Sequence, residues 1–512
     1  MRKLVKTLNN LHYLLKNWVP NAPLCFFNTI KLDSRKIVKG DLFIAVLGCF
    51  NDGRNFILEA ISNGAVAILA EANGKTHHGK QYVVNGIPVI YLSDLNKKLS
   101  TLAKIFYRNP GKKQKIIGVT GTNGKTTVTQ LIAQWVNLIG EKSAVMGTMG
   151  YGLLGHLKTT SNTTESAINV QKILYLLDKE KVNLTSMEIS SHALLQHRVS
   201  DINFSAGIFT NLSHDHLDYH NSMESYKTAK WSFFTQHKIK QVIINIDDKI
   251  GKKWLENIPN AVAVSINQNI KINIGKYWLK VVKIHLHKDI STIFFNSSWG
   301  QGTINTILIG DFNISNLMLA LATLLTLKYP LDSLLRVASK LQPIHGRMEL
   351  FFQKGKPKLI LDYAHTPEAL KLALIAARKH CTGKLWCLFG CGGGRDKSKR
   401  PIMGSISKQF ADISIITQDN PRTEDPDKII NDILSGMKDL SDIYVINERI
   451  KAIVQCFITA EPNDLILIAG KGHETYQIIG DNYFQYSDQT IIKHLLEEKY
   501  DSNFLKYISK NN

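Results

Sequence analysis

The stretch Lys115-Ile-Ile-Gly-Val-Thr-Gly-Thr-Asn-Gly-Lys-Thr-Thr127 decides the fold of the region around it. An apolar run that predicts a β-strand leads into glycines, a lysine and two threonines, and a helical pattern follows from Val128 to Ile139. In such a strand–loop–helix unit, backbone N–H groups and the positive helix end bind phosphate, while the lysine reaches the terminal phosphates and a hydroxyl ligates magnesium. Val119 stands where the general phosphate-loop pattern has glycine. We predict a nucleotide-binding loop, with an ordinary Gly/Thr-rich turn as the alternative.

Length and composition describe a multidomain globular protein. The 512 residues suffice for about three domains that each bury a core, and 44% apolar with 21% charged residues is ordinary. No run of about 18 apolar residues occurs, so we expect no membrane insertion. The segment Met1–Asn21 lacks the continuous apolar core of a signal peptide, and the six cysteines are scattered, which favours free thiols and a cytoplasmic location.

The net charge of +21 would suit a protein that binds nucleic acid through its phosphates. The lysines, however, are spread along the chain among many Ile and Asn residues, and neither an Arg-rich tail nor a basic patch with interleaved aromatics occurs. We therefore expect no nucleic-acid partner. An anionic small substrate would benefit from the same field.

Short apolar runs alternate with helical patterns along the whole chain, which predicts an α/β protein of three domains. Turn-rich segments at 108–114 and 342–347 place the expected boundaries at 1–110, 111–343 and 344–512. Five runs in the last region predict a parallel, doubly wound sheet. The predicted strands are 42–47, 65–69, 88–92, 241–246, 292–295, 358–361, 384–389, 413–417, 443–446 and 465–469, and a helix is predicted over 315–327.

Two polar segments of the middle region could hold a metal ion. Asn211–His220 contains three histidines and two aspartates, a donor set that suits zinc, manganese or magnesium. A polar loop without a metal is the alternative, and the neighbouring phosphate loop favours magnesium. Glu188 ends an apolar run, where nucleotide enzymes place the acid that holds magnesium, although a solvent-facing glutamate would look the same.

Three loops of the last region follow predicted strands, where open α/β sheets bind their ligands. They are Leu388–Asp396 with four glycines, Gln418–Glu424, and Ala469–Glu474. Each alone could be a flexible loop. Arg395 and Arg422 in two of them favour recognition of a carboxylate by paired hydrogen bonds.

Taken in order, these motifs make the chain similar to the Mur ligase family, over about Leu32 to Asp488. The motifs are Asp33-Ser-Arg35, Gly121–Thr127, Asn162-Thr-Thr164, Glu188-Ile-Ser-Ser-His192, Asn211–His220, Gly346-Arg-Met-Glu349, Asp362-Tyr-Ala-His-Thr-Pro367, Asp419-Asn-Pro-Arg422 and Gly470-Lys-Gly-His-Glu474.

The resemblance implies an ATP-dependent, amide-bond-forming ligase of peptidoglycan precursor synthesis in the cytoplasm. A small N-terminal domain would bind a UDP-sugar, a central P-loop domain ATP, and a Rossmann-like C-terminal domain an amino acid. The implied substrates are UDP-MurNAc-L-Ala-D-Glu, ATP and meso-diaminopimelate, with Mg²⁺ as the metal. ATP would phosphorylate the γ-carboxylate to an acyl phosphate that the amine attacks. We expect a monomer.

The resemblance also implies roles for individual residues. The catalytic residues would be Lys125, Glu188, His216 and Lys230, and Mg²⁺ would be held by Thr126, Glu188, His216 and a CO2-derived carbamate on Lys230. ATP would contact Gly121, Thr122, Asn123, Gly124, Lys125, Thr126, Thr127, Asn316, Arg347 and Asp362. The UDP-sugar dipeptide would contact Leu32, Ser34, Cys49, Phe50, Asn51, Asn162, Thr163, Thr164, Ser190, Gln196 and Arg198. Diaminopimelate would contact Arg395, Asp419, Asn420, Pro421, Arg422, Gly470 and Glu474.

The residue pattern alone describes Lys230 as a solvated helix lysine, and only the resemblance makes it a modified one. Asp419–Arg422 is the form that resembles diaminopimelate-adding members. We expect diaminopimelate to be selected over lysine, because lysine would leave a guanidinium desolvated and unpaired. Gly394, Gln418 and Cys49 depart from the residues common in relatives, which bears on substrate affinity. Alternative functions are a lysine-adding relative, a folylpolyglutamate synthase-like ligase and a nucleic-acid-stimulated P-loop ATPase.

Overall fold

The computed structural model describes residues 9–48, 51–160, 162–270, 277–287 and 290–497 of the chain. Cys49 and Phe50, two expected substrate contacts, therefore lie outside the described residues. Contacts divide the chain into two compact units. The first comprises Met1–Ile117, Lys142–Ser205 and Ala229–Ile239, and the second comprises Gly118–Glu141, Ala206–Thr228 and Lys240–Asn512.

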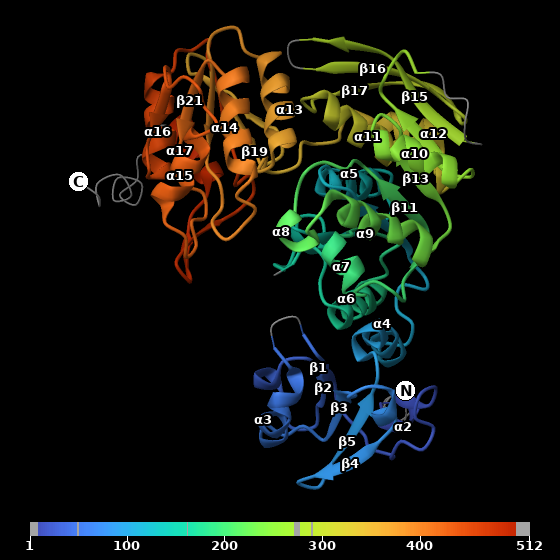
Figure 1. The fold of residues 1–512 in the computed structure, drawn as a ribbon. Helices are drawn as coiled ribbons and strands as arrows, with labels where there is room; N and C mark the ends of the chain where they lie inside the picture. The colour runs from blue at the N-terminus through green and yellow to red at the C-terminus, as the bar shows by residue number, and fades with distance from the viewer. Residues whose placement is uncertain (1–8, 49–50, 161, 271–276, 288–289, 498–512) are drawn as a thin grey trace. The chain divides into compact units, whose positions relative to one another are not determined.

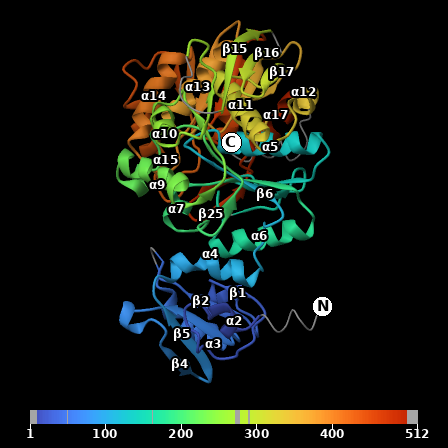
Figure 2. The same ribbon diagram turned by 90° about the vertical axis from the view of Figure 1, so that its right-hand side faces the viewer.

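The N-terminal part of the first unit is a five-stranded sheet with the order β1-β2-β3-β5-β4, parallel except for β4. The strands are β1 (Ile30–Lys31), β2 (Leu42–Ala45), β3 (Ala67–Glu71), β4 (Gln81–Val84) and β5 (Ile87–Leu92), and the helices are α2 (Leu11–Leu15), α3 (Ile57–Ser62) and α4 (Leu95–Phe106). Successive strand residues point to opposite faces. Thus Ile68 packs with Ala60 of α3, whereas Leu69 packs with Leu102 of α4, the helix that lies across the other face (Figure 2).

The remainder of the first unit pairs β7 (Ser143–Gly147) in parallel with β9 (Leu184–Glu188) and antiparallel with β8 (Gly150–Leu153). Helices α6 (Ala167–Lys179) and α7 (Ser191–Leu195) and a short pair of strands, β10 (Asn203–Phe204) and β12 (Lys238–Ile239), complete it. Strand β6 (Lys115–Thr120) and helix α9 (Met223–Gln236) each begin in one unit and end in the other.

The first part of the second unit has the strand order β17-β16-β15-β14-β13-β11. Strands β11 to β15 are parallel and the last two are antiparallel. The strands are β11 (Ala206–Phe209), β13 (Val242–Asn245), β14 (Val262–Ser265), β15 (Tyr277–Leu286), β16 (Ser291–Ser297) and β17 (Gly300–Thr306). The helices are α5 (Lys125–Leu138), α8 (Leu217–His220), α10 (Lys249–Asn257), α11 (Asp311–Thr326) and α12 (Leu331–Ala338). Helix α11 packs against α5, and the indole of Trp135 donates to Leu334 O on α12 at 2.9 Å.

The C-terminal part is the predicted doubly wound sheet, with the order β18-β19-β23-β20-β21-β22 and one antiparallel edge strand, β18. The strands are β18 (Glu349–Phe351), β19 (Lys358–Asp362), β20 (Leu385–Phe389), β21 (Ile413–Ile416), β22 (Ile443–Val445) and β23 (Leu465–Ala469). The helices are α13 (Pro367–Arg378), α14 (Lys399–Phe410), α15 (Pro426–Leu434), α16 (Arg449–Thr459) and α17 (Asp488–Glu497).

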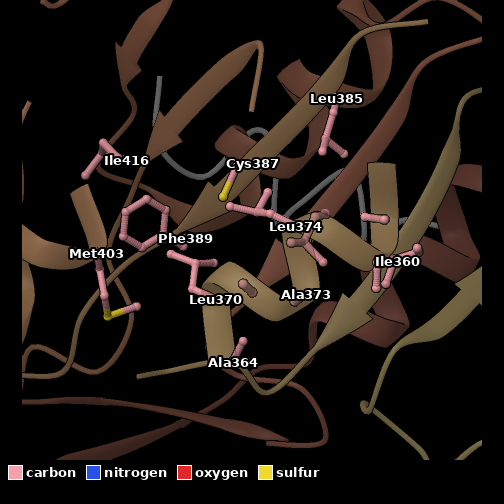
Figure 3. Packing of buried hydrophobic residues seen from close by; sticks show 14 of the residues in the cluster. Ile360, Ala364, Leu370, Ala373, Leu374, Leu385, Cys387, Phe389, Met403 and Ile416 are labelled. Atoms are coloured by element: carbon pink, nitrogen blue, oxygen red, sulfur yellow. The ribbon is translucent and has the colours of Figure 1, made fainter. Parts of the chain in front are cut away.

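Alternation along these strands builds a core on each face of the C-terminal sheet. Cys387 and Phe389 of β20 pack with Leu374 of α13 and Met403 of α14 (Figures 1 and 3), whereas Leu388 packs with the opposite layer, α16 and α17. Parallel strands covered on both faces are continuously apolar, which is why they were recognisable in the sequence. The predicted α/β class and the predicted strands are confirmed. In the described part of the chain, no helix has the length and apolar character needed to span a bilayer.

Candidate nucleotide and substrate sites

The predicted phosphate loop occupies the turn between β6 and α5. Gly121 and Gly124 have φ values of 148° and 86°, a region that favours glycine. A Cβ on Gly121 would clash with the Thr210 hydroxyl, and one on Gly124 with the Asn316 side chain. The glycines therefore let the loop backbone fit closely between neighbouring segments, and the helix that follows presents its N-terminal N–H groups.

The loop is braced by the segment that follows β11. Asn211 accepts a hydrogen bond from Asn123 N at 2.9 Å and donates to Asn123 O at 3.1 Å, and the Thr210 hydroxyl donates to the same carbonyl at 2.6 Å. The hydroxyl of Thr122 lies 3.2 Å from that of Tyr226. No local sequence pattern indicates this role for Thr210 or Asn211, because these contacts join residues about 90 positions apart.

Lys125 lies over the phosphate loop. Its ammonium donates to Gly121 O at 2.9 Å and to Thr122 O at 2.7 Å, so the charge is held where the loop would bind phosphate. The hydroxyl of Thr126 accepts a hydrogen bond from Arg347 Nη2 at 3.1 Å. The buried Thr127 completes the first helical turn.

Arg347 and Asp362 are two of the expected nucleotide contacts, and Asp362 binds the residue that directly follows Arg347. Asp362 accepts hydrogen bonds from Met348 N and Ala364 N, both at 2.8 Å. Burial raises the pKa of Asp362, and the charge of Arg347 opposes that shift. The Arg347 guanidinium stacks 4.3 Å above the Tyr363 ring, while its Nε has no hydrogen-bond partner among the described residues. Arg347 thus has a buried N–H donor that no described residue accepts.

The Asn211–His220 segment places Asp215, which is 7% exposed, among positive groups. Burial by itself would raise the pKa of Asp215, but the surrounding charges hold it below the usual range; they belong to His216, His365, Lys399 and Lys125. His216 has a φ of 55° and its Nε2 lies 3.4 Å from Asp215 Oδ2. In the sequence, Asp215 is recognisable only as one member of the Asn211–His220 cluster.

In the first unit, Glu188 and several expected substrate residues come together. Glu188 accepts hydrogen bonds from Thr148 N at 2.9 Å and Thr148 Oγ1 at 3.1 Å, and its own carbonyl accepts one from Thr164 Oγ1 at 2.7 Å. The Thr164 carbonyl accepts a bond from Arg198 Nη1 at 2.6 Å, and Gln196 Oε1 binds the same guanidinium. A small hollow lies here; its lining includes Gly147, Asn162, Thr163, Thr164 and Glu188.

Ser190 caps α7 by accepting a hydrogen bond from Ala193 N at 3.2 Å, and its own N–H donates to Thr164 Oγ1 at 3.0 Å. In the N-terminal sheet, Ser34 is buried and donates to Glu59 at 2.7 Å, Leu32 is half-buried and Asn51 is exposed.

Lys230 lies on α9 and is 1% exposed. The interpretation from residues alone, a solvated surface lysine, is therefore wrong. The helix buries this position through tertiary packing, which no local pattern shows.

The three expected amino-acid loops meet at the carboxyl ends of β20, β21 and β23. Arg422, half-buried with a φ of 53°, donates from Nη1 to Gly393 O at 2.9 Å. Arg395 is exposed, and a Cβ on Gly392 would contact the side chains of both arginines. Pro421, which directly precedes Arg422, is buried.

The floor of this site is a polar network. Asn420 donates to Glu474 at 2.9 Å, and the fully buried Lys471 donates to both Asn420 and Glu474 at 3.0 Å. Burial raises the pKa of Glu474, and the charge of Asp419 acts in the same direction. A Cβ on Gly470 would press on the Asp419 carboxylate. Lys471 was not among the predicted site residues.

The expected magnesium ligands divide between the units, with Thr126 and His216 in the second and Glu188 and Lys230 in the first. Among the described residues, no group of three or more His, Cys, Asp or Glu side chains lies close enough to hold a metal.

The braced phosphate loop is that of a nucleotide-binding α/β protein, and the strand-end loops form a candidate second site. Three family models match the chain: the Mur ligase family, catalytic domain over residues 27–107, the Mur ligase middle domain over 119–324, and the Mur ligase, glutamate ligase domain over 346–472. The chain belongs to the Mur ligase family and is an ATP-dependent ligase. The family and enzyme class expected from the sequence are confirmed.

Solved structures agree with this assignment. A UDP-N-acetylmuramoyl-L-alanyl-D-glutamate–2,6-diaminopimelate ligase is 31% identical, with a TM-score of 0.66 over 96% of this chain and 99% of that one. MurF ligase from Thermotoga maritima in complex with ADP is 17% identical, with a TM-score of 0.63 over 95% and 99%. Folylpolyglutamate synthase from Mycobacterium tuberculosis, at 14% identity and a TM-score of 0.60, covers 73% of this chain and 92% of its own. The latter two show the fold alone.

Proposed function

We propose that this ligase adds meso-diaminopimelate to the D-Glu γ-carboxylate of UDP-MurNAc-L-Ala-D-Glu, at the expense of ATP. The proposal is supported by the full-length similarity to a diaminopimelate ligase, which includes the N-terminal domain expected to bind the UDP-sugar. The observation that carries the proposal concerns Arg395 and Arg422, the two arginines next to Gly392, and their bonding to neighbouring groups.

Within the described residues, neither Arg395 nor Arg422 forms an ion pair with a carboxylate, and the Arg422 guanidinium donates to the carbonyls of Gly393 and Asn420. The buried Arg400 and Arg449 of the same domain, by contrast, each bind carboxylates. Two guanidiniums that keep charge available on two neighbouring loops suit the distal carboxylate of a diamino dicarboxylic acid. Lysine has no such group.

In the proposed reaction, a γ-carboxylate oxygen of D-Glu attacks the γ-phosphorus of ATP, and ADP leaves. The neutral amine of diaminopimelate then attacks the acyl carbon, and the tetrahedral intermediate loses an N–H proton to solvent and collapses to the amide as phosphate departs. Carboxylate oxygen is a poor leaving group and phosphorylation makes it a good one. Lys125 and Arg347 would neutralise charge that develops on the phosphoryl oxygens, and Asn316 and Asp362 would hold the nucleoside.

Bound Mg²⁺ would neutralise phosphate charge and orient the γ-phosphoryl group. Thr126, Glu188 and His216 supply a hydroxyl, a carboxylate and an imidazole, and a carbamate on Lys230 would add hard anionic oxygens. An ammonium at position 230 would repel the metal, whereas a carbamate there would attract it. Carbon-13 NMR of enzyme equilibrated with labelled CO2 should show a carbamate signal that Lys230→Arg lacks. A wild-type spectrum without that signal would contradict the modification.

The proposed function is tested by phosphate release from ATP, Mg²⁺ and UDP-MurNAc-L-Ala-D-Glu, with diaminopimelate or lysine as acceptor. We expect diaminopimelate to be preferred in kcat/KM by about 10⁴-fold, the discrimination that an unpaired buried polar group gives. Comparable turnover with lysine would make the chain a lysine-adding ligase. Turnover with a folate and glutamate instead would favour the folylpolyglutamate synthase-like alternative.

A further inference from the structure

Arg400, on the first turn of α14, is fully buried at the edge of the amino-acid site. Its guanidinium binds the Glu424 carboxylate with two hydrogen bonds, of 2.9 Å from Nη1 and 2.8 Å from Nη2. It also donates from Nη1 to Asp432 on α15 at 2.8 Å and from Nη2 to Gly392 O at 3.3 Å. One side chain thus connects two helices with the loops that follow β20 and β21.

Glu424 continues this connection. Its Oε2 accepts a hydrogen bond from Gly394 N at 3.0 Å, and its Oε1 lies 3.1 Å from Lys397 Nζ. The carboxylate of one loop therefore holds the backbone of the other loop, immediately before Arg395. The Gly393 N–H also donates to Asn420 O at 2.9 Å.

Both ends of this network reach the two arginines of the proposed diaminopimelate site. Arg422 lies two residues before Glu424 and binds Gly393 O, while Arg395 directly follows Gly394. Bringing two guanidiniums together costs electrostatic free energy, and the loops must be held against it. Position 394 is glycine, with no side chain of its own to fix the loop.

From this arrangement we infer that Arg400 and Glu424 are positioning residues that set the separation of Arg395 and Arg422 and thereby the selectivity for a dicarboxylic amino acid. The inference rests on the proposed function. A buried ion network contributes little net stability over an apolar replacement, because desolvation offsets the attraction. Its geometry, however, is specific, since the planar fork of Arg400 matches the carboxylate. Neither residue needs to touch the substrate.

The test compares Glu424→Gln with Arg400→Lys. In either orientation of the glutamine amide, its N–H2 group would face an N–H of the Arg400 guanidinium, and in one orientation it would also face Gly394 N. The lysine cannot form the fork. We expect kcat/KM for diaminopimelate to fall by about 10- to 100-fold, the effect of an ångström-scale displacement, with KM for ATP within about twofold of wild type. Selectivity over lysine should fall by a similar factor.

The matched control is Asp464→Asn, which also removes a buried carboxylate charge without changing shape. Asp464 binds Lys384 N and Trp386 Nε1 at the amino ends of the strands, the opposite end of the same sheet. This variant should lose stability yet keep its KM for diaminopimelate. If Glu424→Gln does not fold, Asp432→Asn removes only the 44%-exposed partner of Arg400 and should shift KM in the same direction by less.

A loss shared equally by diaminopimelate, ATP and the UDP-precursor, or a loss no larger than that of Asp464→Asn, would overturn the inference. Wild-type selectivity in both Arg400→Lys and Glu424→Gln would also overturn it. Failure of the proposed function is distinguishable, because it would appear as absent diaminopimelate turnover in the wild-type enzyme.

Discussion

Thr148 binds both carboxylate oxygens of Glu188, through its backbone N–H at 2.9 Å and its hydroxyl at 3.1 Å. Gly147, just before it, is the reason that the carboxylate fits: a Cβ there would lie 2.6 Å from the Glu188 carboxyl carbon. The expected magnesium ligand is therefore oriented by the turn between β7 and β8, a segment whose composition shows no catalytic pattern.

Gly147→Ala should displace Glu188 and lower kcat by about 10²-fold, because small misplacements of a metal ligand strongly affect phosphoryl transfer. Metal-free ADP binding should be unchanged. Steady-state phosphate release and calorimetry measure the two quantities. Thr148→Ser, which keeps both hydrogen bonds, is the control. Wild-type kcat in Gly147→Ala would show that the orientation of Glu188 does not matter to the reaction.

Gly121→Ala should weaken ATP binding by about 10-fold or more. The alanine would be strained at a φ of 148° by about 1–3 kcal/mol and would also clash with the Thr210 hydroxyl. Gly140→Ala, at a φ of 90° with open space around it, has the backbone strain without the clash. Calorimetric titration of ATP should therefore separate the variants. Equal affinities would remove the proposed role of the Thr210 contact.

Arg422 has a left-handed backbone, so its replacement has two separable effects. Arg422→Gly should relieve strain and Arg422→Ala should keep it, giving the glycine variant greater stability by about 1 kcal/mol. Both should lose recognition of diaminopimelate, with KM raised about 10²-fold or more as the charge-assisted hydrogen bonds disappear. Denaturant unfolding and acceptor kinetics provide the two readouts. A diaminopimelate KM that stays unchanged in both variants would exclude Arg422 from amine selection.

Acid should destabilise the fold partly through His473. Burial lowers the pKa of His473 to about 3, with the charge of Arg347 acting in the same direction, whereas an unfolded histidine titrates near about 6.5. Between these values the unfolded state binds more protons, so stability falls as the pH falls, by at most about 1.4 kcal/mol per pH unit. His473→Gln should flatten this dependence in urea unfolding between pH 7 and 5. His156→Gln, which changes an exposed histidine, should not.

The strands of the C-terminal sheet were predictable because each is a short apolar run buried on both faces. The polar loops were predictable because each begins where such an apolar run ends. The run Leu465–Ala469, for example, ends where Gly470 begins the loop with Lys471 and Glu474. The order of the strands was not readable, since β23 inserts between β19 and β20 through partners that lie 107 and 80 residues apart in the chain.

The candidate sites divide in the same way. Sequence alone determined the phosphate loop, the family motifs and the residue types at each strand end, because glycines, a lysine and paired arginines at a fixed spacing express local backbone and charge requirements. Only the tertiary structure decided that Lys230 is buried, that Asn211 braces Asn123, and that Arg400 joins the two arginine loops. Those features depend on which distant segments the packed core brings into contact, and such contacts leave no periodic trace along the chain.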